Sequence, residues 1–176
     1  MLKPQDCIIL LKLIANSQKE WSQRQLADSL AISLGEINAG IKRLLEAGLL
    51  RKDGSKHFIY IIRAAEEFLI YSVKYLFPGK PGEYTRGIAT GIGASLFHNK
   101  IASSNADFLP VWPDAQGEQQ GVALKPIYHS VPQALRNNPD QGFYELLAII
   151  DVIRSGRARE RNIAVQLLKD KLENEK

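Results

Sequence analysis

The N-terminal part of the chain contains three segments in which apolar side chains recur every three or four positions. In the first, over about residues 3–16, the side chains of Cys7, Leu10, Leu11 and Ile14 share one face of a helix. Two segments with the same spacing follow, over about residues 22–30 and 33–47. The pattern predicts three helices, and the apolar residues on either side of the first face predict that the first helix is largely buried.

The second and third helices both begin with residues that are typical of helix starts. Ser22 is followed three positions later by Gln25, and Ser33 by Glu36, which is the spacing of a capping box. In both cases an apolar residue precedes the serine and another follows it at the spacing of a hydrophobic staple. Only residues 31–32 separate the two helices, so we expect a sharp crossing, as in a helix-turn-helix.

A hairpin is predicted directly after the third helix. Residues 49–51 and 57–61 have strand composition, and Asp53 and Gly54 between them are a strong turn signal. Three helices followed by a hairpin resemble the winged helix-turn-helix regulators, and more loosely the MarR-like group. Residues 44–50 (LLEAGLL) resemble the end of the recognition helix and the start of the wing in that superfamily. The resemblance covers residues 1–65 and implies a domain that binds duplex DNA.

The apolar face of the third helix determines which of its residues point outward to DNA. We expect Gly35, Asn38 and Ala39 to reach base edges, since the first turns of a recognition helix enter the major groove. The hairpin would contact phosphates or an adjacent minor groove, and the start of the second helix would contact the backbone. The full set of residues expected to bind DNA is Gln23, Arg24, Ser33, Gly35, Asn38, Ala39, Lys42, Arg43, Arg51, Lys52, Ser55 and Lys56.

The distribution of charge is consistent with this assignment. Residues 1–65 contain ten lysines and arginines against six acidic residues, a balance of +4, whereas residues 66–176 contain thirteen of each. All of the excess positive charge therefore lies in the segment that would neutralise phosphates. Winged helices also bind proteins, so the fold alone does not decide the function.

The second part of the chain, residues 66–176, is predicted to be a helical dimerisation or regulatory domain. Helices are expected over about residues 63–77, 130–137, 140–154 and 157–173, and an ordered loop with short extended pieces over 102–128. Within that loop Trp112 is expected to dock onto a core. The predicted fold class is α+β and mainly α, with the winged helix-turn-helix followed by this mostly helical domain.

Residues 87–93 (GIATGIG) have the spacing G-x-x-x-G-x-G found in some dinucleotide-binding proteins. That motif requires a buried strand before it and a helix opening on the pyrophosphate. Neither requirement is met by the flanking sequence. These glycines are therefore expected to serve tight packing or a turn.

The sequence contains no recognisable catalytic or metal-ligating set. His57, His98 and His129 lie far apart, paired cysteines are absent, and neither a Walker loop nor G-x-S-x-G occurs. The single Cys7 lies within an apolar helical face, which suits an inert buried thiol. We expect no enzyme activity, metal or cofactor. A composite site could only be sought where His98 or His129 lies beside Asp107 or Asp114.

Several expectations about partners follow. The apolar run at residues 7–14 is too short to span a bilayer and contains Lys12, so a membrane location and a signal peptide are not expected. One cysteine fits a reducing, cytoplasmic setting. The leading hypothesis is a dimeric repressor that reads a palindromic operator and dimerises through its C-terminal helices. The alternatives are a ligand-sensing regulator with a pocket between residues 84 and 129, and a winged-helix module that binds a protein without DNA.

A second resemblance concerns the tail. Residues 111–113, 130–132, 144–148 and 156–161 resemble the C-terminal part of uncharacterised bacterial regulators encoded near nucleotidyltransferase-like genes in toxin–antitoxin or defence loci. This likeness implies a repressor of its own operon with a protein partner encoded nearby.

Overall fold

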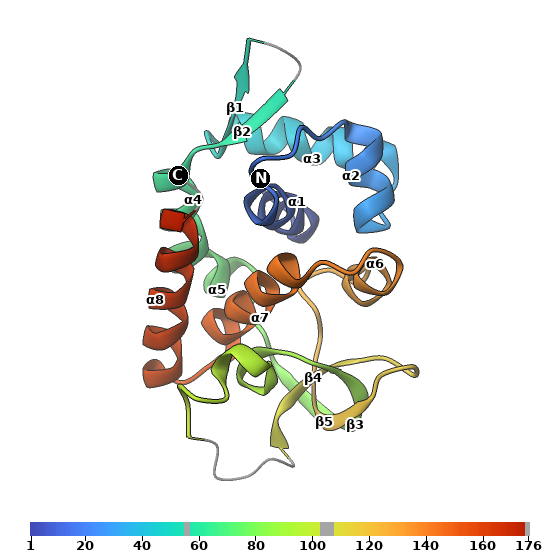
Figure 1. The fold of residues 1–176 in the computed structure, drawn as a ribbon, viewed down its shortest axis with the longest axis vertical. Helices are drawn as coiled ribbons and strands as arrows, with labels where there is room; N and C mark the ends of the chain where they lie inside the picture. The colour runs from blue at the N-terminus through green and yellow to red at the C-terminus, as the bar shows by residue number, and fades with distance from the viewer. Residues whose placement is uncertain (55–56, 103–107, 175–176) are drawn as a thin grey trace.

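Helices and two small sheets make the protein α+β and mainly α (Figure 1). The computed structural model describes residues 1–54, 57–102 and 108–174. The N-terminal elements are α1 (Pro4–Ala15), α2 (Gln23–Leu30), α3 (Leu34–Glu46), β1 (Leu50–Asp53) and β2 (His57–Tyr60). The two strands pair antiparallel, with Arg51 opposite Ile59 and Lys52 opposite Phe58. All five elements lie where the sequence predicts them, and residues 4–60 are called the helix–hairpin unit below.

The connection between α2 and α3 is as short as the sequence predicts. Ala31 adopts the left-handed conformation, with a φ of 52°, and α3 then begins after Ser33. At the start of α2 the capping box is complete, since the Ser22 hydroxyl accepts from the Gln25 amide and the Gln25 side chain accepts from the Ser22 amide. This local pairing fixes the direction in which α2 leaves the preceding loop.

One long helix leaves the hairpin, as the sequence predicts for residues 63–77. It consists of α4 (Ile62–Glu67), a π-helical turn η1 (Phe68–Ser72) and α5 (Val73–Leu76). The π turn was not predicted. Phe68, Leu69 and Val73 are buried as they would be in a regular helix, so the apolar pattern does not distinguish the two. The expected domain boundary at residue 65 lies inside α4.

A three-stranded sheet occupies part of the region expected to be loop. It contains β3 (Pro81–Ala89), β4 (Pro110–Pro113) and β5 (Gln119–Leu124), and each strand pairs with the other two. Short helical turns η2 (Gly91–Gly93) and η3 (Ser95–Phe97) follow β3. The second part of the chain is therefore less uniformly helical than predicted. The physical reason is that β3 is mostly exposed and lacks the regular alternation of a half-buried strand.

The glycines of residues 87–93 serve packing and a turn, as expected. A β-carbon on Gly87 would lie 1.9 Å from the carbonyl oxygen of Trp112 on β4, so only glycine permits this approach of the strands. Gly91 has a φ of +53°, which glycine adopts without strain. Trp112 itself is buried, which confirms that it docks onto the core.

The C-terminal helices α6 (Val131–Asn137), α7 (Gln141–Ser155) and α8 (Ala158–Asn174) also lie where they were predicted. Asp140 caps α7 by accepting from the Phe143 amide. The structure shows a role for one arginine of the basic segment at the start of α8. Arg161 donates to the carbonyl oxygens of Ile153 and Gly156 and so caps the end of α7.

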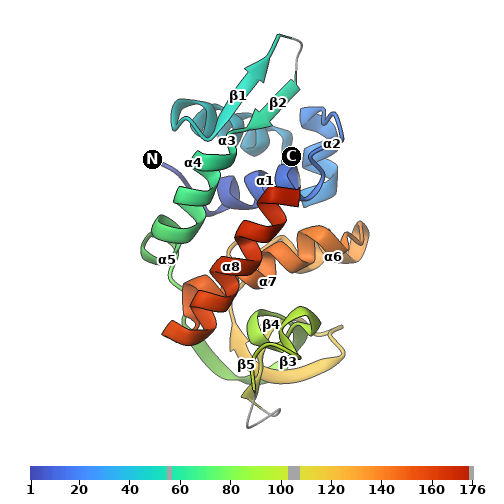
Figure 2. The same ribbon diagram turned by 60° about the vertical axis from the view of Figure 1, so that its left-hand side comes forward.

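The first helix lies at the centre of the molecule, between α3 on one side and α7 on the other (Figures 1 and 2). Every residue of α1 from Asp6 to Ile14 is buried, so this helix has no solvent-facing stripe. The same hydrophobic core includes residues of α3, α4, α7 and α8. The prediction that the first helix is largely buried is confirmed, and it joins the two parts of the chain. No helix in the described ranges is long and apolar enough to cross a membrane.

Candidate nucleic-acid interface

The outer face of α3 carries small and polar side chains. Gly35, Asn38, Ala39 and Lys42 are all exposed and recur at the spacing of one helical face. The opposite face, which includes Ile37, is buried. A β-carbon built on Gly35 would meet no atom within 4 Å, so the first turn of α3 is open to the surroundings. The helix backbone can therefore approach another surface closely there.

The hairpin rises above α3 (Figure 1), and the amide of Leu49 binds the carbonyl of Leu44 at 2.9 Å to join them. Arg51 and Lys52 on β1 are exposed, as expected for residues that contact phosphate. Ser55 and Lys56, also expected to bind DNA, lie outside the described residues.

At the start of α2, Arg24 is exposed and Gln23 is half-buried. Both belong to the first turn of that helix. Lys42 on α3 has an exposed neighbour of opposite charge, with its Nζ 3.9 Å from Oε1 of Glu46. An exposed pair of this kind contributes little and leaves Lys42 available.

Arg43 differs from the other predicted contact residues because it points inward. Its Nε and Nη2 both lie 2.7 Å from the carboxylate of Asp6, which is buried at the start of α1. Gly40 makes this pair possible, since a β-carbon there would lie 2.6 Å from Ile9 Cδ1 and 2.9 Å from Asp6 Oδ1. Arg43 therefore fixes α3 on α1, and its guanidinium group faces Asp6 rather than the outer face of α3.

Ser33 and Glu36 form only part of the expected second capping box. The Ser33 hydroxyl accepts from the Glu36 amide at 3.3 Å, but it donates to the Glu36 carboxylate at 2.9 Å. The other carboxylate oxygen accepts from the Tyr128 hydroxyl at 3.0 Å. These bonds lower the pKa of Glu36, with the Ser33 bond the larger cause and the Tyr128 bond the next. Tyr128, far along the chain, thus helps to hold the first turn of α3.

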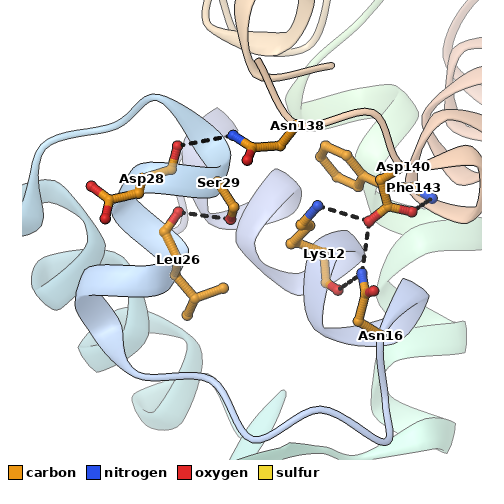
Figure 3. Close-up of polar contacts among 8 residues, drawn as sticks. All are labelled: Lys12, Asn16, Leu26, Asp28, Ser29, Asn138, Asp140 and Phe143. Carbon is orange, nitrogen blue, oxygen red and sulfur yellow. Dashed lines mark hydrogen bonds and ion pairs between the residues drawn. The ribbon is translucent and has the colours of Figure 1, made fainter. Parts of the chain in front are cut away.

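A buried ion pair connects the helix–hairpin unit to α7 (Figure 3). Lys12 Nζ donates to Asp140 Oδ2 at 2.7 Å, and the Asn16 side chain donates to the same oxygen at 2.8 Å. Burial acts to raise the pKa of Asp140, but the bonds from Lys12, Asn16 and the Phe143 amide outweigh it and lower that pKa. Asp140 therefore both caps α7 and binds the side chain of Lys12 on α1.

Two open hollows adjoin Asp140. One, of about 460 Å³, lies between α1, α2 and the segment before α7, with Lys12, Trp21, Asp28 and Asp140 among its lining residues. The other, of about 670 Å³, is lined by residues 87–89 and 116–119 together with residues from α6 and α7. Part of this second hollow falls in the region between residues 84 and 129 where a pocket was expected.

Two of the residues considered for catalysis, Asp114 and His98, make other contacts. Asp114 binds Arg136 at 2.8 Å, and His98 lies 3.2 Å from the carbonyl oxygen of Gly93, while Asp107 lies outside the described residues. Burial raises the pKa of the Cys7 thiol to about 12, which suits an inert thiol. Among the described residues no group of three or more potential ligands could hold a metal ion.

Sequence reasoning missed three polar contacts: Asp6 with Arg43, Asp140 with Lys12, and Asp151 with Arg154. In each case a charged residue stands within an apolar helical stretch, and that signal alone could have marked it as paired. Comparison of the chain with family models, with curated proteins and with solved structures found no match.

Proposed function

We propose that residues 1–65 form a winged helix-turn-helix that binds duplex DNA, and that the protein is a cytoplasmic transcriptional regulator of the dimeric repressor kind. The observation that carries this proposal is the open outer face of α3, with Gly35, Asn38, Ala39 and Lys42, next to a hairpin that exposes Arg51 and Lys52. Small residues let a helix backbone lie deep in the major groove, and Asn38 can bind adenine through two hydrogen bonds. In this arrangement β1 would follow the phosphates.

Further support comes from how α3 is held. Arg43 and Gly40 attach it to α1, and Ser33 and Tyr128 orient Glu36 at its first turn. A recognition helix that is already held in place before binding loses little conformational entropy when it binds. The excess charge of residues 1–65 supplies attraction to phosphate.

The experiment is a titration of the full chain against a duplex from upstream of its own coding sequence and against unrelated duplexes, at several salt concentrations. Replacing Asn38 by Ala removes a base contact, so sequence preference should fall by about 1–3 kcal/mol at one position. Replacing Lys52 by Ala removes a phosphate contact, so all duplexes should bind more weakly and the salt slope should fall by about one.

The matched control is Lys80→Ala, which removes another exposed lysine, from the loop before β3. It should leave affinity and salt slope unchanged. If no duplex binds, or if Asn38→Ala and Lys80→Ala behave alike, the assignment of α3 and the hairpin to DNA is wrong.

A further inference from the structure

A segment from the second part of the chain lies against the first turn of α3. It comprises residues 125–130, between β5 and α6, and is called the flanking segment below. The Tyr128 hydroxyl donates to Glu36 Oε1 at 3.0 Å, and the buried Ser130 hydroxyl donates to the carbonyl oxygen of Leu30 at 2.8 Å. The following helix, α6, lies beside α2 (Figure 1). The flanking segment is therefore fixed to both α2 and α3.

The flanking segment exposes a histidine whose ring nitrogens are free. His129 is exposed, and its ring centroid lies 4.3 Å from that of Tyr128. Within the described residues neither nitrogen of this ring has a hydrogen-bond or ion-pair partner. The pKa of Glu36 is lowered chiefly by the Ser33 bond, and the positive charge of His129 contributes to the same lowering. The imidazole therefore lies within electrostatic reach of the Glu36 carboxylate.

Glu36 lies on the flank of α3 rather than on its outer face. One residue after Gly35 is a rotation of about 100° around the helix, which places Glu36 between the outer face and the buried face that includes Ile37. The bond from Tyr128 shows that the Glu36 carboxylate meets the flanking segment on this side. The flanking segment thus borders the outer face of α3 at the end where the helix begins.

The dimensions of duplex DNA determine what this border would meet. A helix with its side chains is about 10–12 Å across, and the major groove is about 12 Å wide. A recognition helix therefore fills the groove, and the phosphates at the groove edges lie against its flanks. With the outer face of α3 on base edges, the flanking segment reaches the phosphates of one strand beside the first turn.

We propose that His129 binds a phosphate at the edge of the major groove, so that the second part of the chain also contributes to the DNA contact surface. An imidazole N–H donates to a phosphate oxygen in this contact. The charge of His129 has a second effect, because the Glu36 carboxylate repels nearby phosphates and a cation beside it offsets that repulsion. This inference rests on the proposed function, since it requires α3 to lie in the groove.

The test is a titration of the full chain against the duplex from upstream of its own coding sequence and against an unrelated duplex, at several salt concentrations. The variants are His129→Lys and His129→Glu, which differ by two charges. Each charge beside a phosphate changes the slope of log association constant against log salt by about 0.9. The two slopes should therefore differ by about two, with that of His129→Lys the steeper. His129→Lys should bind both duplexes about tenfold more tightly than His129→Glu.

The matched control is the pair Asn162→Lys and Asn162→Glu. Asn162 is an exposed residue near the start of α8, and α8 begins at the end of the molecule away from the hairpin (Figure 1). A charge so far from the duplex is screened by salt, so these two slopes should differ by less than about 0.5. All four substitutions are on the surface, and thermal unfolding followed by circular dichroism should show that each variant folds as the wild type does.

Two results would overturn the inference while DNA binding stands. One is a pair of slopes for the residue 129 variants that differ no more than those of the control pair. The other is a changed sequence preference in these variants, which would make His129 a base contact. If the wild-type chain binds no duplex, the proposed function fails and this inference falls with it. If duplexes bind and Lys52→Ala lowers the slope, but the residue 129 variants behave like the controls, only this inference fails.

Discussion

Asp140 at the start of α7 and Asp151 near its end each hold another part of the molecule, but in different surroundings. Asp151 is 1% exposed and accepts from Trp112 Nε1 at 2.6 Å, Thr90 Oγ1 at 2.7 Å and Arg154 Nη1 at 2.5 Å. These bonds join the second sheet to α7. The Asp140 side chain keeps 16% of its exposure and lies between two hollows.

The two contacts therefore differ in access to solvent: the Asp151 network is closed to water, here called the sealed joint, and the Asp140 contact is partly open to it. Around Asp151 no water can replace a lost partner. Removal of one member of this network is therefore expected to leave the other buried polar groups without compensation. Around Asp140, solvent in the hollows can compensate in part. The attachment of the second sheet should therefore be the firmer of the two, and the attachment of the helix–hairpin unit the more adjustable.

The largest effect should come from Asp151→Ala. It removes the carboxylate partner of the buried Arg154 cation, which keeps its bond to the Phe77 carbonyl oxygen, and it leaves two donors unpaired, so the free energy of unfolding should fall by about 3–5 kcal/mol. Urea denaturation followed by tryptophan fluorescence measures this. The control Asp170→Ala removes an exposed carboxylate from α8 and should change stability by less than about 0.5 kcal/mol. A loss below about 1 kcal/mol for Asp151→Ala would contradict the sealed joint.

A smaller loss is expected for Asp140→Ala. It removes the α7 cap and the partner of Lys12, but an open hollow adjoins the pair and Asp140 is partly exposed, so we expect a loss of about 2–3 kcal/mol in the same denaturation assay. Asp140→Asn keeps an oxygen for the cap and should cost less than Asp140→Ala. If Asp140→Ala costs as much as Asp151→Ala, the two joints are equivalent and the comparison fails.

The smallest effect is a change in acid sensitivity. The pKa of Asp140 is lower in the folded chain than the unfolded value of about 3.9, so its ionised form stabilises the fold above that value. This stability is lost as the pH falls through the folded pKa. Stability measured from about pH 6 to about pH 3 should therefore fall less steeply in Asp140→Asn than in wild type. Equal slopes would show that Asp140 is not held in its charged form.

The helices were predictable because their signals are local. Ser22 and Gln25 sit three residues apart and form their box within α2, and the apolar periodicities of α7 and α8 are long and regular. The second predicted capping box, at Ser33 and Glu36, forms only in part, and one reason lies far away in the sequence. Tyr128, 92 residues after Glu36, takes one of its carboxylate oxygens, and no pattern within α3 indicates that contact.

The second sheet was missed because its strands meet through backbone rather than through side chains. Gly87, Gly117 and Gly121 stand where a β-carbon would lie 1.9–2.2 Å from a carbonyl oxygen of a neighbouring segment. Glycines in a sequence indicate turns as readily as close packing, so strand pairing of this kind gives no alternation to detect. The outer face of α3 was predicted residue by residue, except that the inward direction of Arg43 depends on Asp6.

The burial of α1 on every side has a consequence for the order in which the protein matures. The side chains that cover one face of this helix belong to α7, which is synthesised long after α1. Until then the face of α1 that carries Lys12, which contacts Asp140 and the Phe143 ring, has no cover. The helix–hairpin unit can therefore reach its final form only when most of the chain has been made, and a nascent chain that stops early would expose its most apolar segment.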